Sequence, residues 1–164
     1  MILKEILNRR SVREYRSKAI SEEDIIEIIK AGQFAPTAKN NKAIDFIIIR
    51  NQKTKDKIFE IVGQEFVKEA PVLIVPVSDT TKTNFPIQDL AVATENIFLQ
   101  ATALELGTVW KNLHPEWREE IKKILGIPEQ YTTINIIPVG YPQNKPKPHT
   151  DGDFDIQKIH KEQW

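Results

Sequence analysis

The chain has 164 residues, with 23 basic side chains, 23 acidic side chains and a formal net charge of zero, and it contains no cysteine. This length suits one soluble domain with its own hydrophobic core, and the missing cysteines exclude disulfides, thiolate nucleophiles, iron–sulfur clusters and cysteine-based zinc sites. Any redox chemistry must therefore come from a bound cofactor. The neutral total argues against an extended nucleic-acid surface, although it permits a site for one small anionic ligand.

The sequence also lacks the signals that direct a chain to or across a membrane. No apolar run approaches the roughly 18 residues of a spanning helix. Residues 1–5 have no basic segment, apolar block or cleavage site of a secretory signal. We therefore expect a soluble cytoplasmic protein without a membrane partner.

The first half of the chain is expected to contain three helices and two strands. The spacing of apolar residues and the β-branched runs predict helices at 2–7, 21–34 and 52–69 and strands at 44–50 and 72–77. Ser21, with Asp24 three residues on, resembles a capping box at the start of the second helix. The third helix is expected to break at Gly63, and Pro76 to interrupt or edge the second strand.

The second half is expected to contain the longest helix, two further strands and a proline-rich tail. The pattern predicts helices at 86–106 and 115–125, strands at 108–113 and 132–139, an extended segment at 140–152 and a terminal helix from Phe154. Small side chains in the longest helix would let another helix approach closely, in this chain or in a second one; they are Ala91, Ala93, Ala101 and Ala103. No repeat or composition shift marks a second domain, so residues 1–164 are interpreted as one α+β domain.

The basic cluster after the first helix is a candidate binding site. Arg9, Arg10 and Arg13 surround the hydroxyl of Ser11, and arginine forks match phosphate oxygens in bidentate geometry. The cluster is therefore suited to a phosphate group. From charge alone, a solvated basic turn at the end of a helix is the simpler interpretation.

Two other segments carry side chains suited to the same ligand. The loop at 36–41 has small and amide side chains that could hydrogen-bond the edge of a flat heteroaromatic ring, although such a segment is more often a turn. In the tail, Lys145, Lys147 and His149 alternate with prolines on an extended backbone. These cations could close over the same phosphate, or the tail could be an exposed proline-rich arm.

Five motifs occur in the order and spacing of a known protein family. They are Asn8-Arg-Arg-Ser-Val-Arg-Glu-Tyr, Ala35-Pro-Thr-Ala-Lys-Asn, Gln88-Asp-Leu-Ala-Val-Ala-Thr-Glu-Asn, Leu106-Gly-Thr-Val-Trp and Val139-Gly-Tyr-Pro. With the ending Lys158-Ile-His-Lys-Glu-Gln-Trp they cover nearly the whole chain, which resembles the nitroreductase family of FMN-dependent flavoproteins. The resemblance implies an α+β fold with a central, mostly antiparallel sheet flanked by helices. It also implies an intertwined homodimer with one FMN in each of two interface sites.

The resemblance assigns FMN contacts to four segments of this chain. The phosphate and ribityl chain would be bound by Arg9, Arg10, Ser11 and Arg13. Arg13 would also reach the polar edge of the ring. From the other subunit, the ring would be contacted by Pro36, Thr37, Ala38 and Asn40. A strand would contribute contacts, partly through its backbone, from Trp110, Lys111 and Asn112. The tail cations that complete the phosphate site would be Lys147 and His149.

The resemblance also implies a ping-pong reaction carried by the flavin. NADH or NADPH delivers hydride to FMN and leaves, and a small acceptor such as a nitroaromatic or a quinone replaces it. No side chain has to act as a nucleophile and no metal is required, while Arg13 or Lys111 would stabilise the anionic reduced flavin. His114 and His160 are assigned no role. The absence of a Gly-rich dinucleotide fingerprint fits a brief visit by NAD(P)H, and it equally fits a protein that never uses NAD(P)H.

Departures from the family pattern keep an alternative open. The residues at 42–44 are Lys-Ala-Ile where the family commonly has Gln-Pro-Trp, Lys111-Asn112 replaces a common Ile-Gly, and His149 replaces a more usual arginine. These changes alter the pocket more than the phosphate site. The alternative is a flavin-binding or flavin-sequestering protein with little NAD(P)H turnover. Nucleic-acid binding is disfavoured, because the basic start is short and only Tyr15 interleaves with it.

Overall fold

The computed structural model describes residues 1–164. Its α-helices are α1 (Lys4–Asn8), α2 (Glu22–Gln33), α3 (Gln52–Val62), α4 (Glu65–Glu69), α5 (Pro86–Ala103) and α6 (Pro115–Leu125). Its strands are β1 (Ile44–Ile49), β2 (Val72–Asp79), β3 (Gly107–Thr108), β4 (Lys111–Asn112), β5 (Tyr131–Thr132) and β6 (Asn135–Gly140). Three short 3₁₀ helices are η1 (Ala38–Asn40), η2 (Asp151–Asp153) and η3 (Ile156–Lys158). No helix is long and apolar enough to cross a membrane.

The strands form one antiparallel sheet around the fully buried strand β2. The order is β1-β2-β6-β3, with β4 paired to β6 and β5 paired to β2. On one side of β2, β6 pairs with residues 72–74 and β5 with residues 78–79, so pairing lapses around Pro76. Proline has no N–H to donate to a ladder. The sheet therefore accommodates Pro76 inside a central strand, at a gap between two partner strands.

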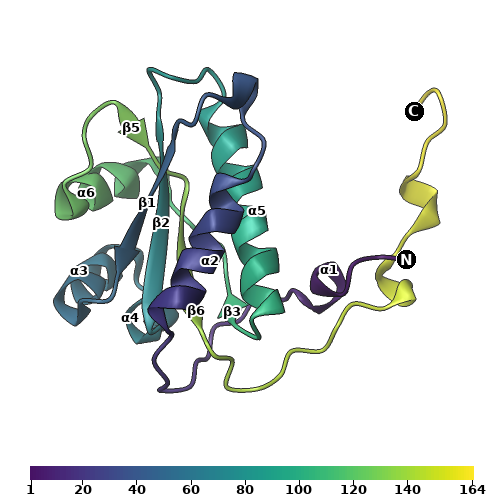
Figure 1. Cartoon of the computed structure of the whole chain (residues 1–164), viewed down its shortest axis with the longest axis horizontal. Helices are drawn as coiled ribbons and strands as arrows, with labels where there is room; N and C mark the ends of the chain where they lie inside the picture. Colours follow the sequence, from purple (N-terminus) through teal and green to yellow (C-terminus); the bar gives the residue numbers. More distant parts are fainter.

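Helices cover both faces of this sheet and create two hydrophobic core clusters. Helices α3, α4 and α6 lie on one face and α2 and α5 on the other (Figure 1). Side chains of β2 alternate between the clusters, with Leu73 and Val75 in the first and Val72 and Ile74 in the second. Because β2 contributes to both clusters, it reads as a continuous apolar run in the sequence. The expected α+β architecture, a mostly antiparallel sheet flanked by helices, is confirmed.

Local signals in the sequence fix several helix ends. The Ser21 hydroxyl accepts a hydrogen bond from the Asp24 amide at 3.0 Å and caps α2. Gly63 ends α3 with a φ of +65°, and Gly126 ends α6 with a φ of +64°. Glycine adopts this left-handed conformation without a Cβ penalty. The predicted break of the 52–69 helix at Gly63 is thereby confirmed.

Four expected elements differ from the structure. The helix expected at 86–106 ends at Ala103, because Glu105 adopts a φ of +59° and the Leu106 amide turns back to donate to the Ala101 carbonyl at 2.8 Å. The strands expected at 108–113 and 132–139 are each divided into two short strands. The terminal helix expected from Phe154 is wrong, since residues 154–164 are exposed and contain only the short helix η3. Short helices are stabilised mainly by packing, and this segment has no core to pack against within its own chain.

The extended N-terminal segment and the tail run side by side along the β3 edge of the sheet. The Val12 amide donates to the Thr108 carbonyl at 2.9 Å, and Tyr15 bridges to Pro142. The tail then follows the N-terminal segment backwards, because the Gln143 amide donates to the Glu14 carbonyl at 2.9 Å. Figure 1 shows α1 and the C-terminal segment extending together away from the sheet and helices.

We expect Gly107→Ala to disturb this edge, because its methyl group would lie 2.6–2.7 Å from the Val12 side chain. Overpacking of this kind lowers the free energy of unfolding by about 1–3 kcal/mol. Gly152→Ala is the control, since the nearest atom to its methyl group is the Thr150 hydroxyl at 3.5 Å. Urea denaturation measures both effects. Equal midpoints for the two variants would contradict the close packing of Val12 on Gly107.

Candidate functional site

The extended backbone of residues 9–13 separates the N-terminal arginines into two sets. Side chains alternate along an extended segment, so Arg9, Ser11 and Arg13 share the face opposite to Arg10 and the buried Val12. The Arg13 guanidinium carbon lies 6.0 Å from the centre of the Phe66 ring on α4. Alternation thus places three of the four predicted N-terminal residues on one side of this segment, where Arg13 contacts α4 and Arg9 contacts α5.

Arg10 points to the other side of the segment. Its Nη1 donates to the Lys147 carbonyl at 3.1 Å. There it lines a cavity of about 340 Å³ between α1, the end of α5 and the tail, together with Lys4, Arg16 and Lys145. Arg10 therefore holds the tail backbone, and its side chain lies on the opposite side of the segment from Arg9 and Arg13.

Arg9 has a weak ion pair with α5. Its Nε lies 3.9 Å from Oε1 of Glu95, whose side chain is half exposed. Burial raises the pKa of the Glu95 carboxyl, and the positive charge of Arg9 opposes this shift. A long, half-exposed ion pair contributes little stability, about 0–1 kcal/mol. The guanidinium of Arg9 therefore remains available to a stronger anion.

The tail brings two further basic side chains, Lys147 and His149, to the same end of the molecule. The His149 amide donates to the Leu7 carbonyl at 2.8 Å, and the Lys147 carbonyl is held by Arg10. His149 Nδ1 also lies 3.6 Å from Oδ2 of Asp153. The Thr150 amide, more than the nearby His149, lowers the pKa of the Asp153 carboxyl. Lys147 and His149 thus lie next to the basic segment at residues 9–13, although most of the sequence separates them from it.

The residues predicted at 110–112 point to two faces of the sheet. Lys111 is buried, and its Nζ lies 4.4 Å from the centre of the Trp117 ring with no carboxylate within 4.0 Å. Burial lowers the pKa of its ammonium group. Trp117 and Phe66 pack against the same core cluster, so Lys111 and Arg13 lie on the same sheet face. Trp110 instead packs edge-on against Phe98 of α5, with ring centres 6.4 Å apart, and Asn112 is exposed.

The loop that contains Pro36, Thr37, Ala38 and Asn40 lies at the other end of α5, where α2 ends (Figure 1). The Ala38 amide donates to Oδ1 of Asp89, in the first turn of α5, at 3.3 Å. At about 1.5 Å per residue, the helix from Asp89 to Ala103 spans roughly 20 Å. Within one chain, the loop therefore lies well away from Ser11, which bridges to Thr108 beyond the other end of α5.

The backbone of this loop is strained. Lys39, Asn40 and Lys42 have φ values of 57°, 51° and 51°, in the left-handed region. For residues other than glycine this conformation costs roughly 1–2 kcal/mol each, although asparagine tolerates it better. Such strain persists only where surrounding contacts hold it, and it concentrates at functional sites.

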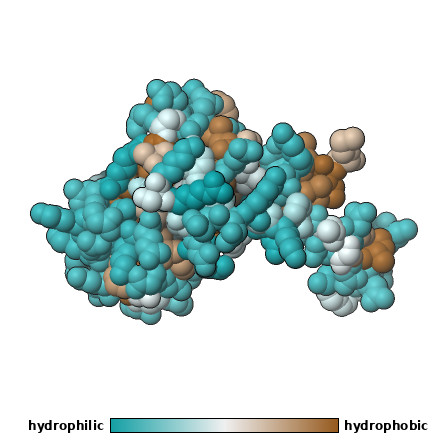
Figure 2. All heavy atoms as spheres, turned by 90° about the horizontal axis from the view of Figure 1, so that it is seen from below, coloured by the Kyte–Doolittle hydropathy of each residue, from teal (hydrophilic) through white to brown (hydrophobic).

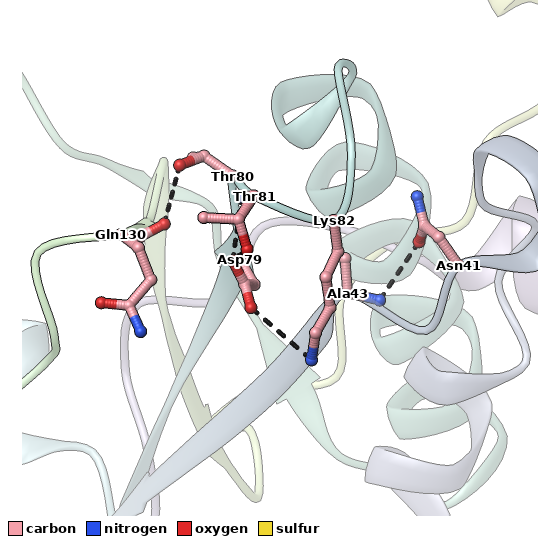
Figure 3. A network of polar contacts seen from close by, with 7 residues as sticks. All are labelled: Asn41, Ala43, Asp79, Thr80, Thr81, Lys82 and Gln130. Carbon is pink, nitrogen blue, oxygen red and sulfur yellow. Dashed lines mark hydrogen bonds and ion pairs between the residues drawn. The ribbon is translucent and has the colours of Figure 1, made fainter.

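A polar network at this end fixes the neighbouring turns (Figure 3). Oδ1 of Asp79 accepts from the amide and the hydroxyl of Thr81 at 2.9 and 2.6 Å, and Oδ2 lies 3.5 Å from Lys82 Nζ. These hydrogen bonds, with a smaller effect of Lys82, lower the pKa of Asp79. The Asp79 amide donates to the Ala43 carbonyl at 2.9 Å, and the Ala43 amide donates to Oδ1 of Asn41 at 3.1 Å. The network therefore joins the turn after β2 to the end of the loop.

Sequence reasoning missed two acidic residues of α5. Asp89 and Glu95 both lie in a quoted motif, but neither was assigned a contact. Asp89 precedes Ala93 and Ile97 at intervals of four residues, so it falls in the buried stripe of the helix. An acid in such a stripe is a readable signal of a specific partner. Glu95 lies on the exposed side, where no sequence pattern indicates its contact with Arg9.

Comparison with known proteins identifies the family. A model of the Nitroreductase family matches residues 6–69 and 61–141. A relative from Archaeoglobus fulgidus, whose name assigns it to the NADH dehydrogenases or NAD(P)H nitroreductases, is 35% identical over 99% of this chain and 98% of its own length. A crystal structure of a Parabacteroides distasonis protein with the same name has a TM-score of 0.92 and 34% identity, covering 98% of this chain and 96% of that one. The structure of an FMN-dependent nitroreductase from Clostridium difficile has a TM-score of 0.94 and 28% identity, covering 99% and 100%. The chain therefore belongs to the nitroreductase family.

Proposed function

We propose that the protein is an FMN-dependent oxidoreductase that works as a homodimer in the cytoplasm. It takes electrons from NADH or NADPH and passes them to a small acceptor such as a nitroaromatic or a quinone. The observation that carries this proposal is the basic cluster at the edge of the sheet: Arg9, Ser11 and Arg13 lie on one side of the N-terminal segment, Lys111 and Arg13 share a sheet face, and the basic tail runs alongside. The FMN-dependent relative from Clostridium difficile supports it. When bound, FMN supplies the hydride-transfer chemistry, and the protein supplies binding, orientation and electrostatics.

The donor set fits the phosphate end of FMN. Arg9 and Arg13 would hold phosphate oxygens through charge-assisted hydrogen bonds, and the Ser11 hydroxyl would donate between them. Lys147 and His149 would complete the shell from the tail. We assign Arg10 the task of fastening the tail, because its guanidinium donates to the Lys147 carbonyl.

Lys111 and Arg13 fit the electron-rich edge of the ring. Both cations lie on the same sheet face, and Lys111 has no carboxylate to neutralise it. A buried ammonium group without a counter-ion is unfavourable by itself. It becomes favourable when negative charge develops next to it, as on a reduced flavin. Trp110 and Asn112 would contribute through the backbone of the same strand.

Exposed apolar side chains support an intertwined homodimer. Large apolar side chains are exposed just before and in α1 and in the C-terminal segment: Ile2, Leu3, Ile6, Phe154, Ile156, Ile159 and Trp164. Figure 2 shows separate hydrophobic patches on the part of the molecule that extends from the body. Large exposed apolar patches mark interaction sites. A second copy would cover them and would bring its Pro36–Asn40 loop to the flavin of the first.

A second candidate function is flavin binding with little turnover. Lys42 is the observation that favours it, because this exposed, left-handed residue starts the Lys42-Ala43-Ile44 departure beside the loop. An added cation there could hinder the approach of NAD(P)H or of an acceptor. The two functions differ in whether the bound flavin can be reduced.

A visible absorption spectrum tests the proposed function. The purified protein is expected to be yellow, and either NADH or NADPH is expected to bleach it under anaerobic conditions. A yellow protein that stays oxidised with both donors would establish the second function instead. A colourless protein that takes up no added FMN would refute both.

The phosphate site is tested by comparing three substitutions. Arg9→Ala and Arg13→Ala are each expected to weaken FMN binding roughly 10- to 150-fold, since a hydrogen bond to a charged group contributes about 1.5–3 kcal/mol. Lys123→Ala on the exposed face of α6 removes the same charge far from the site and should have no effect. Quenching of FMN fluorescence measures the affinities. Equal affinity in all three variants would overturn the phosphate assignment.

The role of Lys111 is tested by Lys111→Met. We expect reduction of the bound flavin by NADH to slow about 10-fold or more, since one charge-assisted interaction of about 1.5–3 kcal/mol is lost. The free energy of unfolding should not fall, because methionine fills the space without burying a charge. Lys68→Met is the control, because Lys68 also lies over an aromatic ring, 4.1 Å from the centre of Phe59, and pairs with Glu65. Stopped-flow absorbance measures the rate at which NADH reduces the bound flavin. Reduction in Lys111→Met at the wild-type rate would refute the assignment.

A further inference from the structure

We propose that Asp89 is a positioning residue that holds the Pro36–Asn40 loop in its strained conformation, ready to contact the flavin of the partner subunit. The contact with the flavin rests on the proposed function, whereas the anchoring of the loop by Asp89 does not.

Asp89 joins two loops that are separated in the sequence. Its Oδ1 accepts from the Ala38 amide at 3.3 Å, and its Oδ2 accepts from the Thr83 hydroxyl at 2.8 Å. The Thr83 hydroxyl in turn accepts from the Phe85 amide at 3.1 Å, just before α5 begins. One carboxylate therefore ties the loop after α2 to the turn that leads into α5.

The burial of Asp89 indicates that the hydrogen bonds of its carboxylate have a specific structural role. Asp89 is only 4% exposed, and its carboxylate forms no ion pair. A buried carboxylate without a cation is unfavourable unless hydrogen bonds satisfy it. The positive end of the α5 dipole helps, because Asp89 lies near its start. A leucine at this place in the buried stripe would pack without that cost, but it could accept no bond from Ala38.

The loop itself has few other anchors. The residues just after Ala38 are the left-handed Lys39 and Asn40, and both are exposed. Besides the bond to Asp89, this turn is closed by the Asn40 amide, which donates to the Thr37 carbonyl at 3.0 Å. A bond at Ala38 therefore fixes the point where the backbone enters its strained stretch. Without it, the loop would relax toward conformations with negative φ.

The experiment measures hydrogen exchange of the loop in the purified protein without FMN. In Asp89→Ala, peptides covering residues 36–42 are expected to exchange at least tenfold faster than in the wild type, because local opening becomes easier. Asp89→Asn should stay within about twofold, since its amide oxygen still accepts from Ala38 and its NH₂ group can donate to Thr83. Asp79→Ala is the matched control: it removes a similarly buried carboxylate, 6% exposed, whose side chain bonds only within its own turn. Its link toward the loop is made by the backbone amide, which donates to the Ala43 carbonyl and is kept in alanine.

A second readout reports on the flavin. In the FMN-loaded proteins, Asp89→Ala should lower the visible circular dichroism of the bound flavin at least twofold, because the partner's loop no longer fixes the ring. Asp89→Asn and Asp79→Ala should match the wild type. If Asp89→Ala does not fold, Thr83→Val gives the same test. Valine keeps the shape of the threonine side chain but cannot donate to Asp89, which loses one of its two donors. Loop exchange should therefore rise at least threefold.

The outcomes separate the two proposals. Wild-type loop exchange in Asp89→Ala or Thr83→Val, or an equal acceleration in Asp79→Ala, would overturn the positioning role of Asp89. Faster exchange with an unchanged flavin signal would overturn the contact between loop and flavin while keeping the anchoring. A wild-type protein that binds no FMN would refute the proposed function and leave the exchange result interpretable.

Discussion

The hydrogen bond from the Val12 amide to the Thr108 carbonyl, 2.9 Å long, holds the N-terminal segment extended along the sheet edge, and the geometry of the cation cluster depends on it. An extended backbone alternates its side chains. As a result Arg9, Ser11 and Arg13 face one way, whereas Arg10 faces the tail and fastens it. Gly107 and Gly140 make this arrangement possible, because a Cβ on either would lie 2.6 Å from the nearest atom of Val12 or Tyr15.

Helix α5 sets the second constraint by keeping the two halves of the candidate site apart. The end of α5 leads into β3, which pairs with the basic segment at Ser11, and the start of α5 holds the Pro36–Asn40 loop through Asp89. Roughly 20 Å of helix lies between them within one chain. In the proposed homodimer, two chains would build a site that uses both halves, and the exposed apolar side chains of the N-terminal and C-terminal segments would provide the contact surface.

Local and periodic signals made the helices, the sheet and the caps predictable, because each depends on neighbouring residues. Ser21, Gly63 and Gly126 mark helix ends by conformational preferences that hold in any context. The family motifs identified the candidate residues but not their directions: that Arg10 turns away from Arg9 follows from pairing with a strand almost 100 residues later. The terminal helix was predicted wrongly, since periodicity alone cannot show whether an apolar segment finds a core in its own chain to pack against. The bond between Ala38 and Asp89 joins residues 51 apart and has no local signature.

A complementation measurement tests most directly the claim that two chains build each site. One chain carries Arg9→Ala with Arg13→Ala, the other carries Thr37→Trp to block the ring, and the two are refolded together. Flavin reduction by NADH is then compared with that of each variant alone. If two chains build each site, random pairing in a two-fold symmetric dimer restores about a quarter of the sites, all in heterodimers. If one chain builds a complete site, every site in the mixture stays damaged, and a mixture no more active than its parents would contradict this account.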